Sequence, residues 1–265
     1  MKYPMCFQAY GRSDIGRARK NNQDSGYFSS KACVVADGVG GAAAGEVASA
    51  TMVHTLAQCF ESNIPQALRS AFAKANDKLS ARIAEQPETY GMATTCTGIF
   101  LGQAGLSLAH LGDSRCYRLH DHKFSQVTRD DTWAQLLVDQ GLLEPEEVAT
   151  YPMRNLLLHA LSGGIQDSAV VNISTFDVVE GDRWVLTSDG VHSYLDADLI
   201  EQIVSTAADA RTCADELVER ALETTHDNVT AIVADVVVAQ CDDTDNFVGA
   251  AIGESLTLPS WQLPA

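Results

Sequence analysis

Residues 34–49, VVADGVGGAAAGEVAS, join an apolar strand to a helix through an aspartate and a cluster of glycines. Asp37 ends the apolar run, and three of the next four residues are glycines. A carboxylate at the margin of a strongly apolar strand is partly desolvated, so it needs a polar partner or a cation. The stretch therefore marks both a buried strand and a candidate site at its end.

The same pattern, an apolar strand that meets an aspartate in a turn, occurs three more times. The segments are LAHLGDS at Asp113, WVLTSDG at Asp189 and HDNVTAIV at Asp227. In an antiparallel sheet the end of one strand lies beside the beginning of the next, so Asp189, which ends a strand, and Asp227, which begins one, can share an edge, and Asp37 can join them there. Clustered carboxylates repel unless cations neutralise them, and oxygen ligands suit Mg²⁺ or Mn²⁺ rather than zinc or copper. The alternative is four independent turns, since Asp and Gly both favour turns.

Predicted strands occur in groups, and predicted helices occur in adjacent pairs. The strands fall within residues 7–37, 93–119, 171–187 and 229–238, and the helices include 53–60, 68–79, 199–204 and 217–222. Because no sustained β-α-β alternation appears, the predicted fold class is α+β, with two antiparallel sheets covered by helix pairs. Residues 93–119 are typical of an antiparallel meander, and residues 131–161 are predicted to be polar and helical.

The charge and the cysteines exclude several classes of protein. The formal net charge of −17 should repel nucleic acid and anionic membranes, so a site that handles phosphate needs local positive charge. No apolar run is long enough to cross a membrane, and Met1-Lys2-Tyr3-Pro4 does not lead into a signal peptide, so we expect a cytoplasmic protein. The seven scattered cysteines contain no C-x-x-C pair, which argues against a disulfide framework and a zinc-thiolate site.

Positive charge is concentrated in the segment SDIGRARKNNQD, residues 13–24. Arg19 is the candidate phosphate clamp, because its planar guanidinium can contact two phosphate oxygens. A solvated basic turn is the alternative for this segment taken alone.

The sequence gives only weak support to three other kinds of site. Residues 38–43 satisfy the G-x-G-x-x-A pattern of dinucleotide sites, but a second predicted helix follows the first where a strand is needed. Cys6 and Arg12 stand at C-x5-R spacing without the glycine-rich loop of a cysteine phosphatase. No H-E-x-x-H motif supports a zinc hydrolase.

Seven motifs in order give the chain a resemblance to a known family. They are SDIGRARKNNQD, VVADGVGGAAAGEVAS, GMATT, HLGDSR, VTRDDTWAQLLVDQG, LTSDG and DNVT. Together they resemble the metal-dependent protein phosphatases of the type-2C class, in particular the compact bacterial members, up to about residue 238. The resemblance implies a four-layer αββα sandwich, with a phosphatase domain over residues 1–240 and a flap at about 130–165. We expect residues 241–265 to form a loosely docked tail.

The resemblance also implies how the carboxylates share two or three Mg²⁺ or Mn²⁺ ions. Asp37 looks like the ligand that bridges two metals, with the backbone carbonyl of Gly38 on the second. Asp189 and Asp227 look like ligands of the first metal. Asp113 resembles the residue that holds a third metal together with Asp189 in bacterial relatives.

Two catalytic residues are implied as well, and two positions depart from the family pattern. Arg19 matches the phosphate-binding arginine, and Asp24 is retained. Many relatives have Glu-Asp where this chain has Gln23-Asp24, which predicts a weaker second metal site. Val39 stands where eukaryotic relatives carry a general-acid histidine, so a metal-bound water is expected to supply the leaving-group proton.

The implied function is hydrolysis of phosphoserine and phosphothreonine in proteins by a metal-activated water, with no phosphoenzyme. The expected partners are phosphorylated proteins, with a bacterial Ser/Thr protein kinase as the functional counterpart, and we expect a monomer that binds neither nucleic acid nor membrane. Two alternatives stay open: a pseudophosphatase that senses or binds without turnover, and a phosphatase dedicated to one phosphorylated regulator.

Overall fold

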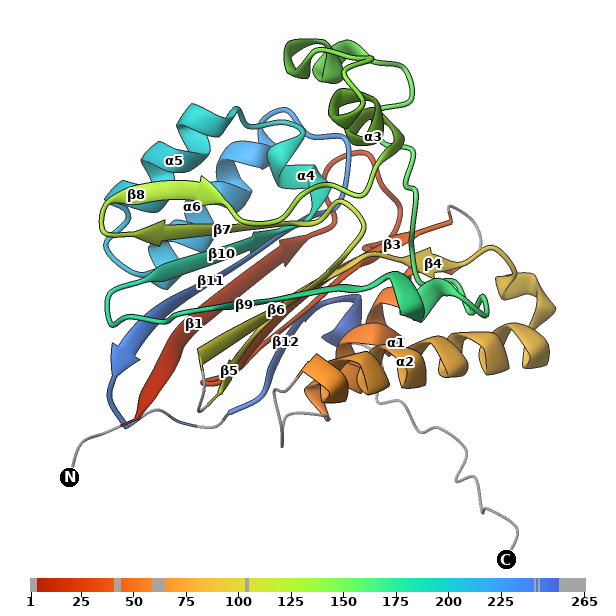
Figure 1. The fold of residues 1–265 in the computed structure, drawn as a ribbon, viewed down its shortest axis with the longest axis horizontal. Coiled ribbons are helices and arrows are strands. Elements are labelled where there is room, and N and C mark those ends of the chain that lie inside the picture. Colours follow the sequence, from red (N-terminus) through yellow and green to blue (C-terminus); the bar gives the residue numbers. More distant parts are fainter. Residues whose placement is uncertain are drawn as a thin grey trace, which may run out of the picture.

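The computed structural model describes residues 4–40, 44–58, 65–102, 105–240, 242 and 244–252, which form two packed antiparallel sheets with helices on both outer faces (Figure 1). The first sheet has the order β1 (Met5–Asp14), β11 (Val229–Val238), β10 (Arg183–Thr187), β7 (Arg115–His120) and β8 (Lys123–Gln126). The second has the order β12 (Asn246–Gly249), β2 (Asp24–Phe28), β3 (Ala32–Val39), β5 (Cys96–Gly102), β6 (Gly105–Leu111) and β9 (Asn172–Phe176), with β4 (Ala93–Thr94) paired to β3.

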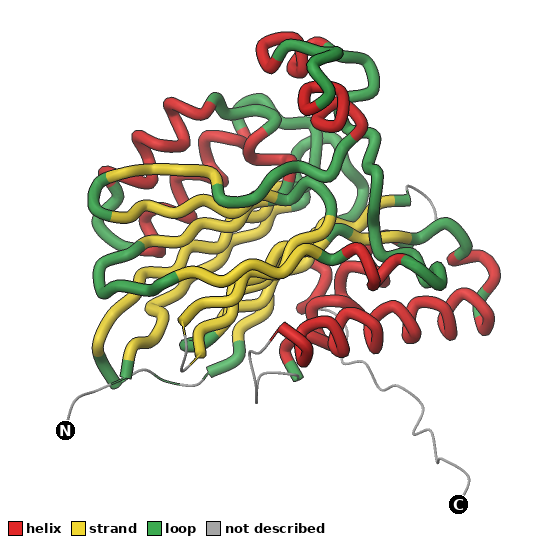
Figure 2. Tube along the Cα trace, viewed as in Figure 1, coloured by secondary structure: helices red, strands yellow, loops and turns green. Residues whose placement is uncertain are grey.

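Helix pairs cover the two outer faces, so the predicted α+β class and the four-layer arrangement are confirmed (Figure 2). The second sheet is covered by α1 (Gly45–Ala57) and α2 (Pro65–Glu85), and the first by α5 (Ala197–Thr206), α6 (Ala210–Leu222) and the short α4 (Asp189–His192). Short 3₁₀ turns lie at η1 (Pro87–Thr89), η2 (Pro145–Thr150), η3 (Asp167–Val170) and η4 (Ala250–Ile252). The predicted stripe of α2 points into the core, since Leu68, Phe72 and Leu79 are buried in the apolar cluster that also contains residues of α1 and of the second sheet.

Three apolar clusters fill the spaces between the four layers. Met52 and Phe72 lie in the cluster between helices and the second sheet, Leu217 in the cluster under α6, and Trp184 and Ile232 in the cluster between the sheets. Burial of such side chains contributes roughly 1.5–3 kcal/mol each. Cys33, Cys96, Cys116 and Cys213 are buried free thiols, whereas Cys6 is disulfide-bonded.

The predicted meander over residues 93–119 is wrong in its last strand. β5 pairs with β6 as expected, but β7 pairs with β10 and β8 in the other sheet. Gly112 has a φ of 96°, a left-handed backbone that favours glycine, and it begins the crossover from one sheet to the other. Asp113 therefore lies in the segment that connects β6 of the second sheet to β7 of the first.

The prediction of a helical segment over residues 131–161 is only partly confirmed. Within it the structure has α3 (Trp133–Asp139) and the 3₁₀ turn η2, while the remainder is irregular, because Gly141 ends α3 and Pro152 breaks the following run. Figure 1 shows α3 standing beyond the ends of the sheets. Isolated bridges pair Thr94 with Leu161 and Thr132 with Leu157, and they tie this segment to the sandwich.

The expectation of a loosely docked tail is wrong for the residues at its start that the structure describes. Asn246–Gly249 form the edge strand β12 beside β2, and Ala251 is buried against α1. The hydroxyl of Tyr27 donates a hydrogen bond of 2.5 Å to Asp245. The remainder of the predicted tail, like Phe60 of the first predicted helix, lies outside the described residues.

No helix within the described ranges is long and apolar enough to cross a membrane.

Candidate metal centre

The four predicted aspartates lie at one end of the sandwich, where strands end or begin. Asp37 lies near the end of β3, Asp113 in the crossover to β7, Asp189 at the first residue of α4, and Asp227 just before β11. All four line one cavity of ≈ 250 Å³. The predicted residues Arg19 and Gly38 line it as well. The structure therefore brings together every residue predicted to bind metal.

A close backbone contact positions two of these carboxylates. A Cβ atom on Gly190 would lie 1.8 Å from the carbonyl oxygen of Asn228, so α4 can begin at Asp189 only if the next residue has no side chain. This contact holds Asp189 against the turn that carries Asp227.

The carboxylates are desolvated and repel one another. Desolvation and then the charges of Asp24, Asp189, Asp113 and Asp227 raise the pKa of Asp37 well above its ordinary value. Desolvation and the charge of Asp227 raise the pKa of Asp189 to about 6, and desolvation and the charge of Asp189 raise the pKa of Asp113. Such a group lacks positive charge, which protons or cations can supply.

Arg19 partly neutralises this negative charge. Arg19 donates to Oδ2 of Asp227 at 2.6 Å, and this hydrogen bond raises the pKa of the guanidinium. Among the described residues, no three acidic, histidine or cysteine side chains surround a single point in this arrangement. The donor set, carboxylates and a carbonyl with no thiolate or imidazole, nevertheless fits Mg²⁺ or Mn²⁺.

Asp24, predicted as catalytic, lies behind the cavity and is not among the residues that line it. Its side chain is 1% exposed and accepts hydrogen bonds from the hydroxyls of Ser188 at 2.6 Å and Thr230 at 2.7 Å. Desolvation, opposed by these two hydrogen bonds, raises the pKa of Asp24 to about 7. Asp24 contributes negative charge beneath the cavity, and its hydrogen bonds connect the start of β2 to the end of β10 and the start of β11.

The structure adds residues that the sequence did not single out. Asn228 accepts from the backbone N–H of Gln23 at 2.8 Å and donates to the carbonyls of Ile15 and Asn21, which holds the segment that carries Arg19. Its place in the DNVT motif was the only signal for this role. Asn155 and Leu157 reach the cavity from the flap segment, and no periodicity marked them. 

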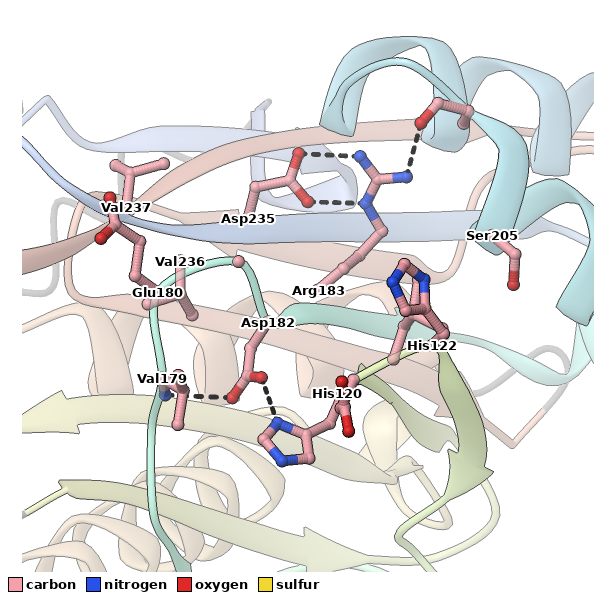
Figure 3. Close-up of a pocket in the computed structure, with 14 residues that line it drawn as sticks. His120, His122, Val179, Glu180, Asp182, Arg183, Ser205, Asp235, Val236 and Val237 are labelled. Carbon is pink, nitrogen blue, oxygen red and sulfur yellow. Dashed lines mark hydrogen bonds and ion pairs between the residues drawn. The ribbon is translucent and has the colours of Figure 1, made fainter.

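A larger cavity of ≈ 680 Å³ lies at the opposite end of the first sheet (Figure 3). Asp182, 2% exposed, accepts from Arg118, from the Val179 N–H and from Nδ1 of His120. Arg183 makes two hydrogen bonds to Asp235 and two to backbone carbonyls at the end of α5. These charged side chains are paired with one another, so we interpret their role here as structural: they connect β7, β10, β11 and the end of α5.

Comparisons with known proteins agree with the fold and the cavity. A model of the protein phosphatase 2C family matches residues 11–227. The chain therefore belongs to the protein phosphatase 2C family.

Among similar proteins is a serine/threonine protein phosphatase, PstP, of Mycobacterium tuberculosis, 36% identical over 257 residues. The alignment covers 94% of this chain and 49% of PstP, so the chain spans about half the length of that relative. The serine/threonine phosphatase stp of Listeria monocytogenes is 28% identical, with 84% of this chain and 94% of that protein covered.

Solved structures of PstP superpose closely on this chain. The Mycobacterium tuberculosis structure gives a TM-score of 0.83 at 35% identity, covering 88% of this chain and 99% of that one. A second structure, of the PstP catalytic domain in complex with two manganese ions, gives a TM-score of 0.80 at 35% identity, covering 88% of this chain and 100% of that one.

Proposed function

We propose that this chain is a metal-dependent protein serine/threonine phosphatase that hydrolyses phosphoserine and phosphothreonine. The observation that carries the proposal is the single cavity in which Asp37, Asp113, Asp189 and Asp227 meet beside Arg19. In a chain with a net charge of −17, a site that binds cations can attract a phosphoryl group, because the bound cations would reverse the local charge. The names of the similar proteins support the same activity.

The carboxylates are proposed to hold two ions, with Asp37 between them and the Gly38 carbonyl on the second. Asp189 and Asp227 would hold the first ion, and Asp113 with Asp189 would hold a third ion more loosely. When bound, the ions supply the positive charge that activates a water for attack on phosphorus and neutralises the phosphoryl oxygens.

Arg19 is proposed to bind the phosphoryl group. Its side chain is 46% exposed at the cavity, and its present partner is Asp227. With Asp227 committed to an ion, the guanidinium would be able to donate two hydrogen bonds to phosphoryl oxygens. Arg19 therefore orients the substrate without holding metal.

Direct attack by water is supported by the residues that line the cavity. None of those the structure describes is a serine, threonine, cysteine or histidine, so they supply no hydroxyl, thiol or imidazole nucleophile, and the aspartates among them are assigned to the ions. Val39 lines the cavity and cannot donate a proton. Water is therefore the proposed source of the leaving-group proton.

The proposal extends to the setting of the enzyme. We place the phosphatase domain at residues 1–240 together with the edge strand β12, with the flap at about 130–165. Phosphorylated proteins are its substrates, a Ser/Thr protein kinase is its counterpart, and a cytoplasmic monomer is its expected form.

The test is hydrolysis of a phosphothreonine peptide by purified protein, with Mn²⁺ and with excess chelator. We expect phosphate release with Mn²⁺ and none with chelator, and much slower release from a phosphotyrosine peptide. Binding of the peptide without turnover at any Mn²⁺ concentration would instead support the pseudophosphatase alternative.

A further inference from the structure

One wall of the metal cavity is a buried amide. Gln23 is 7% exposed and lines the cavity beside Gly38. The sequence resemblance places a glutamate here in many relatives, which predicted a weakened second metal site. The surroundings of Gln23 lead to a different conclusion.

The backbone of Gln23 is fixed on three sides. Its N–H donates to Asn228 at 2.8 Å. Its carbonyl accepts from the Gly38 N–H at 3.1 Å and from the Ser49 hydroxyl at 2.6 Å. The side chain therefore leaves from a rigid point beside Asp37 and Gly38.

Glu46, in the first turn of α1, determines which way the amide faces. Nε2 of Gln23 donates to Oε2 of Glu46 at 3.0 Å. A carboxylate accepts hydrogen bonds and cannot donate them, so the amide nitrogen must face Glu46 and the amide oxygen must face away from it.

The amide lies close to the carbonyl expected to bind the second ion. A Cβ atom on Gly45 would lie 2.7 Å from the Gly38 carbonyl oxygen and 3.2 Å from Cδ of Gln23. The amide carbon and that carbonyl oxygen thus lie on the same side of the Gly45 backbone. Amide oxygens are accepted ligands of hard cations, as backbone carbonyls are.

We propose that the side-chain oxygen of Gln23 is a ligand for the ion at Gly38, and that Glu46 is the residue that positions it. This inference rests on the proposed metal centre and assigns a ligand of that centre in this chain. Glu46 also places negative charge one hydrogen bond away from the Gln23 amide, which would offset the charge that the neutral amide lacks. Partners of this kind orient a metal ligand and typically change metal affinity 10–100-fold.

The chain offers a matched control on the same carboxylate. Nδ2 of Asn21 donates to the same Oε2 atom of Glu46, at 3.1 Å. Asn21 is exposed and is not among the residues that line the cavity. Replacing Asn21 removes the same kind of hydrogen bond from Glu46 without removing an oxygen from the metal site.

The experiment measures Mn²⁺ binding to the full chain, by the electron paramagnetic resonance signal of free Mn²⁺ and by calorimetry, without any substrate. Gln23→Leu should raise the dissociation constant of one Mn²⁺ ion by about tenfold or more, and it should leave that of the most tightly bound ion within about twofold of wild type. Gln23→Glu, which keeps an oxygen ligand, should bind that ion about as tightly as wild type does. Glu46→Ala should weaken the same ion, and Glu46→Gln, which keeps an acceptor oxygen, should weaken it less.

Asn21→Ala should bind Mn²⁺ like wild type, with all variants melting cooperatively. Wild-type binding of every ion in Gln23→Leu or in Glu46→Ala would overturn the inference while the metal centre stood. Equal weakening in Asn21→Ala and Glu46→Ala would overturn the positioning role of Glu46. Failure of the wild-type chain to bind Mn²⁺ at millimolar concentration would refute the proposed function itself, and this inference with it.

Discussion

Replacing Asp24 by asparagine tests whether buried negative charge makes the metal-free protein unstable. Asp24 is 1% exposed, and its desolvation raises the pKa of the carboxyl from 3.8 to about 7. Below the lower value the carboxyl is protonated in both states and has no effect on stability. Above the higher value the carboxyl must be ionised in the folded chain, where burial disfavours the charge. The free energy of unfolding is then lowered by the full amount that corresponds to the pKa difference.

The size of this effect follows from the pKa difference. About three pKa units at 1.36 kcal/mol per unit give a loss on the order of 4 kcal/mol at pH 8, shared with the coupled carboxylates around Asp24. Asparagine keeps an oxygen that accepts from Ser188 and Thr230 but carries no charge. Without metal, Asp24→Asn should therefore be more stable than wild type at pH 8, by up to about 4 kcal/mol, with the difference vanishing towards pH 4.

Urea unfolding of chelated protein at several pH values between 4 and 8 measures this difference. The control is Asp121→Asn, an exposed carboxylate in the turn between β7 and β8, which should show no comparable change. If Asp24→Asn were no more stable than wild type at pH 8, the buried charge would not be the source of instability. Added Mn²⁺ should stabilise wild type more at pH 8 than at pH 5, because the ions replace protons.

Three further substitutions test the site. Arg19→Ala should raise the Michaelis constant and lower the rate with a phosphothreonine peptide while the Mn²⁺ dependence survives; a loss of Mn²⁺ affinity at an unchanged Michaelis constant would contradict its role. Asp113→Ala should fold normally, keep the tighter ions and lose most activity on phosphoproteins, whereas turnover curves against Mn²⁺ that superimpose on wild type would remove the third site. Gly190→Ala should lower the unfolding free energy in urea by about 3 kcal/mol or prevent folding, because a Cβ would lie 1.8 Å from the Asn228 carbonyl oxygen; wild-type stability would contradict the observed start of α4.

Sequence patterns predicted the position of the site better than the path of the chain. Asp189 and Asp227 lie together because β10 ends and its neighbour β11 begins at the same edge, a consequence of pairing that apolar runs reveal. Asp37 comes from β3 in the other sheet, so the packing of the two sheets, and not strand pairing, brings it to the site. Asp113 lies at the site because the chain crosses from the second sheet to the first just before β7. Periodicity shows that 115–120 is a strand but not which sheet it joins, so the crossover at Gly112 was invisible.

Other features depend on contacts between distant segments. The strand β12 looked like part of an acidic tail because its four residues carry too little pattern to predict an edge strand. The hydrogen bond between Gln23 and Glu46 joins two different elements, because Gln23 directly precedes β2 and Glu46 lies in the first turn of α1. Propensity and spacing describe single elements, so they do not report such contacts.

The most direct test of the metal-dependent mechanism compares wild type with Asp37→Asn in one Mn²⁺ titration that follows both bound ions and hydrolysis of a phosphothreonine peptide. In wild type, turnover should rise as the ions bind. Asp37→Asn removes the charge expected to join two ions, and it should fold, bind Mn²⁺ at least tenfold more weakly and show almost no hydrolysis. Hydrolysis by Asp37→Asn at the wild-type rate, or wild-type turnover that does not depend on bound Mn²⁺, would contradict the assignment of this cavity as the catalytic metal centre.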